Sequence, residues 1–144
     1  MLTRWLIDIN VISELRRPRC DASVRSWIDS RDSASLFLSR VSIVEVRFGI
    51  ARAPDAATRI GLELWLSDTL LPWFQDRILD ADESVLLRWR EMLEEGCKRG
   101  RTFSEPDLLL AATASAHGLS VATRNTVDFT DTGLEVVNPW TAAP

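Results

Sequence analysis

The segment LIDINVISEL, residues 6–15, joins a short apolar run to a helical pattern and has an acid at the junction. Asp8 therefore stands at the carboxyl end of an expected buried strand. Burying a carboxylate costs several kcal/mol unless the group is paired, hydrogen-bonded or bound to a metal ion. The rest of the sequence is expected to supply a partner for Asp8.

Strands and helices alternate along the chain. Short apolar runs bounded by turn residues predict strands, and apolar residues at helical spacing predict helices between them. The expected strands cover residues 3–8, 35–39, 77–80, 119–124 and 134–138, and the expected helices cover residues 10–17, 21–31, 40–53, 55–74, 81–100 and 104–118. This alternation is typical of a three-layer α/β/α domain with a central, mainly parallel sheet of about five strands.

Length and composition narrow the class of protein. The 144 residues predict a single domain, residues 1–144, with one substantial core. No apolar stretch approaches the roughly 18 residues that a membrane span requires, and the N-terminus lacks a signal-peptide pattern, so we expect a cytoplasmic protein with no membrane partner. The net charge of -4 argues against a uniformly basic surface for nucleic acid. Cys20 and Cys97 are far apart, which disfavours a disulfide framework and a zinc site.

Two further acids stand among apolar residues. Glu45 interrupts the apolar run at residues 41–50 and is expected to project from a largely buried helix face; alternatively, it lies at the edge of that face beside Arg47 or Arg52. Asp107 belongs to an S-x-x-D capping pattern, which by itself explains an acid at a helix start. The small apolar face that follows would pack on the sheet and bring Asp107 to the edge where Asp8 lies.

Polar residues also follow the fourth expected strand. Ligands of open parallel sheets bind beyond the carboxyl ends of the strands, near the point where the strand order reverses. Asp8 and Asn125 fall in that region, with Asp128 nearby. His117 is interpreted as a polar residue near a helix C-terminus rather than as a catalytic base. Carboxylates without a competing nucleophile motif favour Mg²⁺ or Mn²⁺, which can activate water against a phosphodiester.

Four segments carry a family resemblance: LIDINVISE (6–14), VSIVEVRFGIA (41–51), DLLLAATASAHGLSVATRNTVDF (107–129) and VVNPW (136–140). In order and spacing, and over nearly the whole chain, they resemble the PIN-domain toxins of the VapC type. The first segment matches the pattern D-x-N-x-x-x-E, and the closing NPW resembles the FitB-like, plasmid-stability branch.

The resemblance implies the toxin component of a type II toxin–antitoxin system. Such a toxin is a Mg²⁺- or Mn²⁺-dependent ribonuclease that hydrolyses RNA phosphodiester bonds and is neutralised by a small cognate antitoxin of the VapB type. The resemblance also implies a homodimer, a toxin–antitoxin hetero-oligomer, and promoter DNA contacted only through the antitoxin. The expected helix at 55–74 carries Trp65 and Trp73 and more apolar residues than one helix usually buries, which fits such partner surfaces.

The resemblance also assigns roles to residues of the candidate site. The three principal catalytic and metal-binding acids are Asp8, Glu45 and Asp107, and the residues that line the site are Asn10, Ser42, Thr123 and Arg124. Asn125 stands where some relatives carry aspartate. A fourth metal position is therefore filled either by the Asn125 amide or by Asp128.

Two other functions stay open. A haloacid-dehalogenase-like phosphatase would use Asp8 as its nucleophile, but it needs a second acid where Asn10 stands and a supporting lysine, for which Lys98 is the single candidate. A catalytically weak PIN-fold module that only binds an antitoxin would explain Asn125, which brings no charge to the site. Cleavage of RNA with added manganese would separate both from a ribonuclease.

Overall fold

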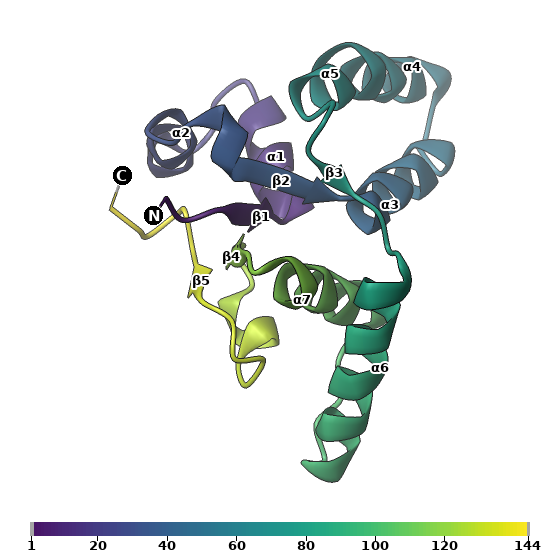
Figure 1. Ribbon diagram of the computed structural model, residues 1–144. Helices are drawn as coiled ribbons and strands as arrows, with labels where there is room; N and C mark the ends of the chain where they lie inside the picture. Colours follow the sequence, from purple (N-terminus) through teal and green to yellow (C-terminus); the bar gives the residue numbers. More distant parts are fainter. Residues whose placement is uncertain (1, 144) are drawn as a thin grey trace.

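The computed structural model describes residues 2–143 and contains a five-stranded sheet in which every neighbouring pair of strands is parallel (Figure 1). The strands are β1 (Trp5–Ile7), β2 (Leu36–Ser39), β3 (Ile78–Leu79), β4 (Ser120–Ala122) and β5 (Val136–Val137). Their order across the sheet is β3-β2-β1-β4-β5. The five expected strands are confirmed, and β1, which leads directly into Asp8, is the central one.

Helices connect the strands and cover both faces of the sheet, which confirms the three-layer architecture (Figure 1). They are α1 (Ile9–Arg16), α2 (Ala22–Asp29), α3 (Arg40–Ala51), α4 (Ala56–Trp65), α5 (Leu71–Trp73), α6 (Glu83–Lys98) and α7 (Glu105–His117), with short 3₁₀ turns η1 (Ser33–Ser35) and η3 (Thr126–Phe129) and a π turn η2 (Leu66–Leu70). Asp21 caps α2 as predicted, by accepting from the backbone N–H groups of Ser23 and Val24.

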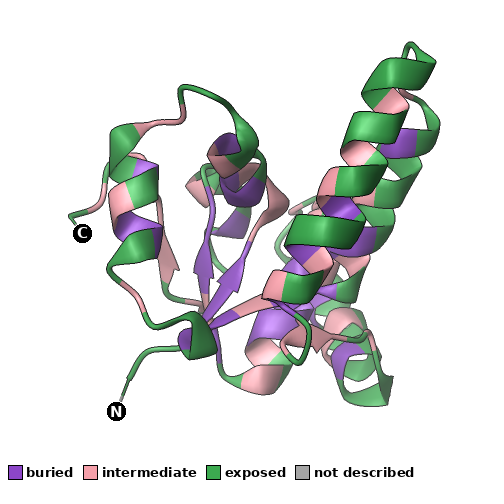
Figure 2. Cartoon of the chain, turned by 90° about the horizontal axis from the view of Figure 1, so that it is seen from above, coloured by how far each residue is buried: buried purple, intermediate pink, exposed green. Residues whose placement is uncertain are grey.

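Alternate residues of β1 enter two separate cores. Trp5 and Ile7 pack with α1, α2, α3 and η2 on one face, whereas Leu6 packs with α6 and α7 on the other. Figure 2 shows the buried strands between helices whose outer sides are exposed. Each fully buried Leu or Ile contributes about 1.5–3 kcal/mol, so burial on both faces fixes the position of β1 and of the residue that follows it.

The segment at residues 55–74 differs from the single long helix that we expected. It consists of α4, the π turn η2 and the short helix α5. None of the residues of α4 is buried, whereas Leu66 and Leu70 in the π turn are. The wider turn places both leucines on the core side. Among residues 2–143, no helix combines the length and apolar character needed to cross a bilayer.

The strand order reverses at β1. After β1 the chain adds β2 and β3 on one side of this strand, and it then returns to add β4 and β5 on the other side. The carboxyl ends of β1 and β4 therefore form the crevice in which open α/β sheets bind their ligands. Asp8 follows β1 directly, and residues 123–125 follow β4.

Candidate active site

A buried threonine hydroxyl links the ends of β1 and β4. Thr123 Oγ1 donates to Asp8 Oδ2 at 2.8 Å, across 115 residues of sequence. The same Oγ1 accepts from Asn10 Nδ2 at 3.3 Å and from the Asn125 backbone N–H at 3.1 Å. Asn10 Nδ2 also lies 3.4 Å from Asp8 Oδ2, and Asn10 Oδ1 accepts from the Arg124 backbone N–H at 3.4 Å. The partner that the sequence requires for Asp8 is therefore Thr123, supported by Asn10.

Burial raises the pKa of the Asp8 carboxyl above its ordinary value. The hydrogen bond from Thr123 lowers this pKa, whereas the nearby Asp107 carboxylate raises it again. A half-buried carboxylate that faces a second negative charge is poorly stabilised in its ionised form, so a cation bound by both groups would relieve an existing repulsion. Asp8 and Asp107 are thus brought within electrostatic reach of each other, as the sequence predicts.

Asp107 is positioned by the start of α7. The Ser104 hydroxyl accepts from the Asp107 backbone N–H at 3.3 Å and donates to Asp107 Oδ2 at 2.7 Å. The predicted cap is therefore confirmed. Leu110, Ala111 and Ala114 on the same helix are buried in the core that contains Leu6 and Val121 of the sheet. Close packing of these small side chains holds the first turn of α7 at the edge of the sheet.

Glu45 does not project from a largely buried face, contrary to the sequence-based expectation. Its side chain is exposed, and Val44 and Phe48 beside it are 56% and 60% exposed. Ser42, one turn earlier in α3, is buried. The apolar residues of this run lie on more than one side of α3, and the core covers only one side. The apolar residues on the other side therefore remain exposed to solvent. Among residues 2–143, no ion pair includes Glu45, and neither Arg47 nor Arg52 neutralises it.

The three acids expected to form one metal site do not converge in this structure. Within residues 2–143, no three acidic, histidine or cysteine side chains converge closely enough to hold one metal ion together. Asp107 lies close enough to raise the pKa of Asp8, and Glu45 lies on α3, which packs against α7. Three carboxylates repel one another without a counter-charge, and an exposed glutamate changes rotamer at little cost. The oxygen donors of this site are nevertheless of the type that Mg²⁺ and Mn²⁺ prefer.

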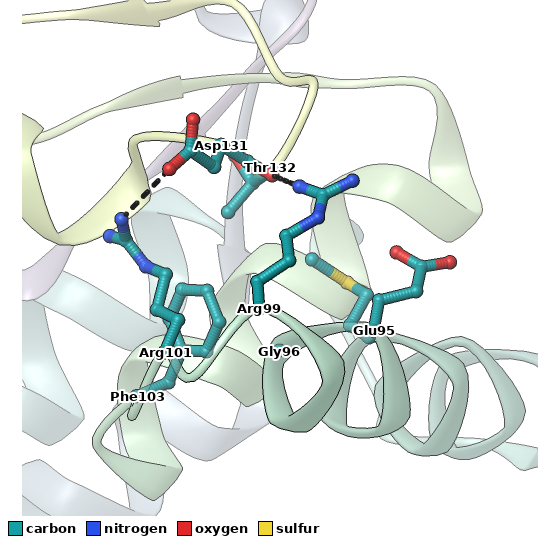
Figure 3. A pocket seen from close by; sticks show the side chains of 8 residues that line it. Glu95, Gly96, Arg99, Arg101, Phe103, Asp131 and Thr132 are labelled. Atoms are coloured by element: carbon teal, nitrogen blue, oxygen red, sulfur yellow. Dashed lines mark hydrogen bonds and ion pairs between the residues drawn. The ribbon is translucent and has the colours of Figure 1, made fainter.

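Asn125 and Asp128 are exposed residues of the segment that follows β4. Arginines of the α6–α7 connection contact Asp131 in the same segment (Figure 3). Arg101 Nη1 lies 3.3 Å from Asp131 Oδ2, and Arg101 Nη2 donates to the Val127 carbonyl at 3.1 Å. Arg99 Nη1 donates to the Asp131 carbonyl at 3.4 Å. The polar run at residues 97–101 therefore holds this segment through its two arginines.

Two grooves lie beside the α4–α5 segment. The first, of about 460 Å³, lies between α3 and the α4–α5 segment and is lined by Arg47, Ile50, Ala51, Ile60, Glu63, Leu64, Leu66, Ser67 and Leu71. The second, of about 390 Å³, is lined by Ile12, Leu15, Arg16, Arg25, Trp65, Thr69, Leu70 and Trp73. Ile60 and Leu64 are about half exposed, at 54% and 55%. Residues 55–74 therefore present exposed apolar surface through Ile60 and Leu64, whereas Trp65 and Trp73, which we expected to be prominent there, are half-buried against the core.

Comparison with known proteins places this arrangement in a family. The model of the PIN domain matches residues 5–133. The chain belongs to the PIN-domain family. Among curated relatives of this PIN-domain chain, the VapC ribonuclease Y4jK of Sinorhizobium fredii is 36% identical over 96% of the chain and 99% of the relative. Plasmid stability protein StbB of Pseudomonas syringae pv. tomato is 39% identical over 95% of the chain and 99% of the relative.

Solved structures of the same family have the same fold. FitAcB from Neisseria gonorrhoeae aligns with a TM-score of 0.89 and 35% identity, over 96% of this chain and 99% of that chain. FitAB bound to the IR36 DNA fragment aligns with a TM-score of 0.88 and 33% identity, over 97% of this chain and 98% of that chain. The predicted PIN fold and the predicted resemblance to the FitB-like, plasmid-stability branch are confirmed.

Proposed function

We propose that this PIN-domain chain is the toxin component of a type II toxin–antitoxin system and a divalent-metal-dependent ribonuclease that hydrolyses RNA phosphodiester bonds. The observation that carries the proposal is the Asp8–Asp107 pair at the switch point of the sheet, with Asp8 oriented by Thr123 and Asn10. The name of the VapC ribonuclease relative supports RNA as the substrate class. Neither a phosphatase nor a catalytically inactive module gains support from these relatives.

The chain's own groups would divide the work as follows. Asp8 and Asp107 would hold a Mg²⁺ or Mn²⁺ ion through carboxylate oxygens, and the exposed Glu45 carboxylate would be a third ligand. Thr123 and Asn10 keep Asp8 Oδ2 in one orientation, because each donates a hydrogen bond to it. Ser42 is buried in the first turn of α3, one turn before Glu45. The bound ion would supply activated water and positive charge for the scissile phosphate.

The fourth position of this site lies on the loop after β4. Asn125 donates its backbone N–H to Thr123 Oγ1, which fixes its backbone to the network, and its side chain is exposed. Asp128 lies three residues further along, on the η3 turn. We assign the weak fourth position to Asn125, with Asp128 as the alternative ligand.

The partners of the chain follow from its grooves and from its family. We assign a VapB-like antitoxin to the two apolar grooves beside α4 and η2, since an amphipathic segment would cover Ile60, Leu64 and Trp65 there. The solved FitAB complex carries a DNA fragment, which supports promoter DNA as a partner reached through the antitoxin. We further propose a homodimer, a larger toxin–antitoxin assembly and a single domain over residues 1–144.

RNA cleavage by the purified, antitoxin-free chain tests the function. We expect cleavage of single-stranded RNA with Mn²⁺ and none with EDTA. Asp8→Asn and Asp107→Asn should each lower the rate at least ~100-fold, which corresponds to about 2.7 kcal/mol of lost transition-state stabilisation. Asp55→Asn is the matched control, because Asn caps a helix about as well as Asp and Asp55 caps α4. Cleavage that survives EDTA, or that is unchanged in Asp107→Asn, would overturn the proposal.

A further inference from the structure

Arg124 stands at the edge of the candidate active site with an exposed side chain. It directly follows Thr123, the buried residue that holds Asp8, and its backbone N–H is bound by Asn10 Oδ1 at 3.4 Å. Its backbone is therefore fixed to the network that orients the acid. Among residues 2–143, no ion pair and no side-chain hydrogen-bond donation involves the Arg124 guanidinium. Among these residues, the Arg124 guanidinium therefore neutralises no acid.

The Arg124 guanidinium instead lies over the ring of Trp140, with 4.9 Å between its central carbon and the ring centroid. An arginine on an aromatic face is held by the electrostatic attraction of the ring. The N–H donors at the edge of its plane stay free in this arrangement. Stacking thus limits the directions in which Arg124 can point without occupying its hydrogen-bonding groups.

Trp140 is itself held in place by the segment that contains it. Asn138 Oδ1 accepts from the Trp140 backbone N–H at 2.9 Å, and the Asn138 carbonyl accepts from the backbone N–H groups of Thr141 and Ala142. Pro139 between them is buried and has a fixed backbone angle. The half-buried Trp140 ring packs against the core. The Asn138–Trp140 segment is therefore a rigid platform beneath Arg124.

A phosphate approaching this site meets the negative charge of Asp8 and Asp107 and needs positive charge to offset it. A guanidinium can bind two phosphate oxygens at once, and it does so with less loss of freedom when its plane is already oriented. We propose that Arg124, held on Trp140, binds a backbone phosphate of the RNA substrate, and that Trp140 is the positioning residue for Arg124. This inference rests on the proposed function, because it takes RNA as the ligand.

RNA binding without cleavage tests the inference. A fluorescent oligouridylate is titrated with the full chain in EDTA at several salt concentrations, and oligoadenylate is used in parallel. Arg124→Gln should weaken binding of both oligonucleotides roughly tenfold and reduce the slope of log K against log salt by about 0.7, the value for one phosphate contact on a single strand. Trp140→Leu should weaken binding in the same direction, whereas Trp140→Phe should retain most of the affinity, since it keeps an aromatic face.

Arg52→Gln is the matched control. Arg52 also lies over an aromatic ring, that of Phe48 at 5.2 Å, but at the C-terminal end of α3. Its loss should leave the salt slope unchanged. Thermal melting of each variant, compared with wild type, separates lost contacts from lost folding. In the Mn²⁺ cleavage assay, Arg124→Gln should raise KM with a smaller change in kcat.

The outcomes separate the inference from the function on which it rests. An unchanged salt slope in Arg124→Gln, equal binding by Trp140→Leu and wild type, or no RNA binding by wild type would each overturn the inference. Wild-type cleavage of RNA together with an unchanged Arg124→Gln slope overturns the inference and leaves the ribonuclease function standing. A reduced slope in a chain that does not cleave RNA supports the phosphate contact and overturns the ribonuclease function.

Discussion

Replacing Thr123 by Val would remove a buried hydroxyl that serves three other groups while keeping the shape of the side chain. The hydroxyl donates to Asp8 and accepts from Asn10 and from the Asn125 backbone N–H. A hydrogen bond to a charged group contributes about 1.5–3 kcal/mol. The two donors that lose their acceptor are less buried and reach water, so they add little. We expect Thr123→Val to destabilise the metal-free fold by about 2–3 kcal/mol at neutral pH.

Thr123→Ser is the matched control, because it keeps the hydroxyl and loses one methyl group. Its expected cost is about 1 kcal/mol from the smaller buried side chain. Urea unfolding in EDTA measures both changes. In a thermal melt, each kcal/mol should lower Tm by roughly 2–4 °C for a chain of this size.

The pH dependence of this difference follows from the pKa of Asp8. Burial raises that pKa in the folded state, so the stability linked to protonated Asp8 is fully present below the ordinary value of 3.8 and is lost as pH rises through the raised folded value. The Thr123 hydrogen bond lowers the pKa and limits this loss. Thr123→Val should therefore lose more stability relative to Thr123→Ser at pH 7 than at pH 3.

The double variant with Asp8→Asn provides a second check, since the charged acceptor is then absent and the extra cost of Val over Ser should fall. If Val and Ser at position 123 are equally stable at pH 7, or if their difference does not change with pH, Thr123 does not support an ionised Asp8 and the reasoning fails.

Asp8→Asn should stabilise the metal-free chain at neutral pH but not below pH 3.8, because it removes a charge whose pKa burial raises, and scanning fluorimetry should also show a smaller Mn²⁺-induced rise in Tm. Asn125→Asp should lower the Mn²⁺ concentration for half-maximal cleavage roughly tenfold, by adding a charge of opposite sign to the ion; an unchanged titration, with cleavage abolished by Asp128→Asn, would move the fourth ligand to Asp128. Arg101→Gln should speed amide hydrogen exchange at residues 125–131 and cost less than about 1 kcal/mol globally, since its ion pair with Asp131 is partly exposed. Light scattering that detects only monomer at micromolar concentration would contradict the proposed homodimer.

Much of the fold could be predicted because its signals are local. A few neighbouring residues are enough to predict the apolar runs that form β1 and β4 and the helix caps at Asp21 and Ser104. The requirement that Asp8 find a partner also came from local pattern and the cost of a buried charge. A parallel sheet with its reversal beside β1, on which the small apolar face of α7 packs, then brings Asp8 and Asp107 together.

The parts that could not be predicted depend on contacts between distant residues. The family resemblance places Thr123 at the site, but no local pattern indicates that its hydroxyl donates to a carboxylate 115 residues away. The exposure of Glu45 depends on which side of α3 the core covers, and an apolar run that spans both sides does not decide this. The π turn at residues 66–70 likewise results from tertiary packing of Leu66 and Leu70. Arg99 and Arg101 contact Asp131 and so join two loops, and local sequence patterns predict contacts between loops poorly.

The position of β1 in the middle of the sheet also determines when Asp8 becomes ordered during synthesis of the chain. β1 is among the first segments to leave the ribosome, yet its neighbour β4 is made 115 residues later, in the register Trp5 with Ser120 and Ile7 with Ala122. Contacts between such distant segments form late in folding. A nascent chain that ends before residue 120 has Asp8 but neither the β4 strand that pairs with β1 nor the Thr123 hydroxyl that orients Asp8. Translation therefore completes the segments that line both apolar grooves, within residues 12–73, before an ordered Asp8 can exist. A partner that binds these grooves, as we propose for the antitoxin, would meet them on the growing chain before the candidate site is assembled.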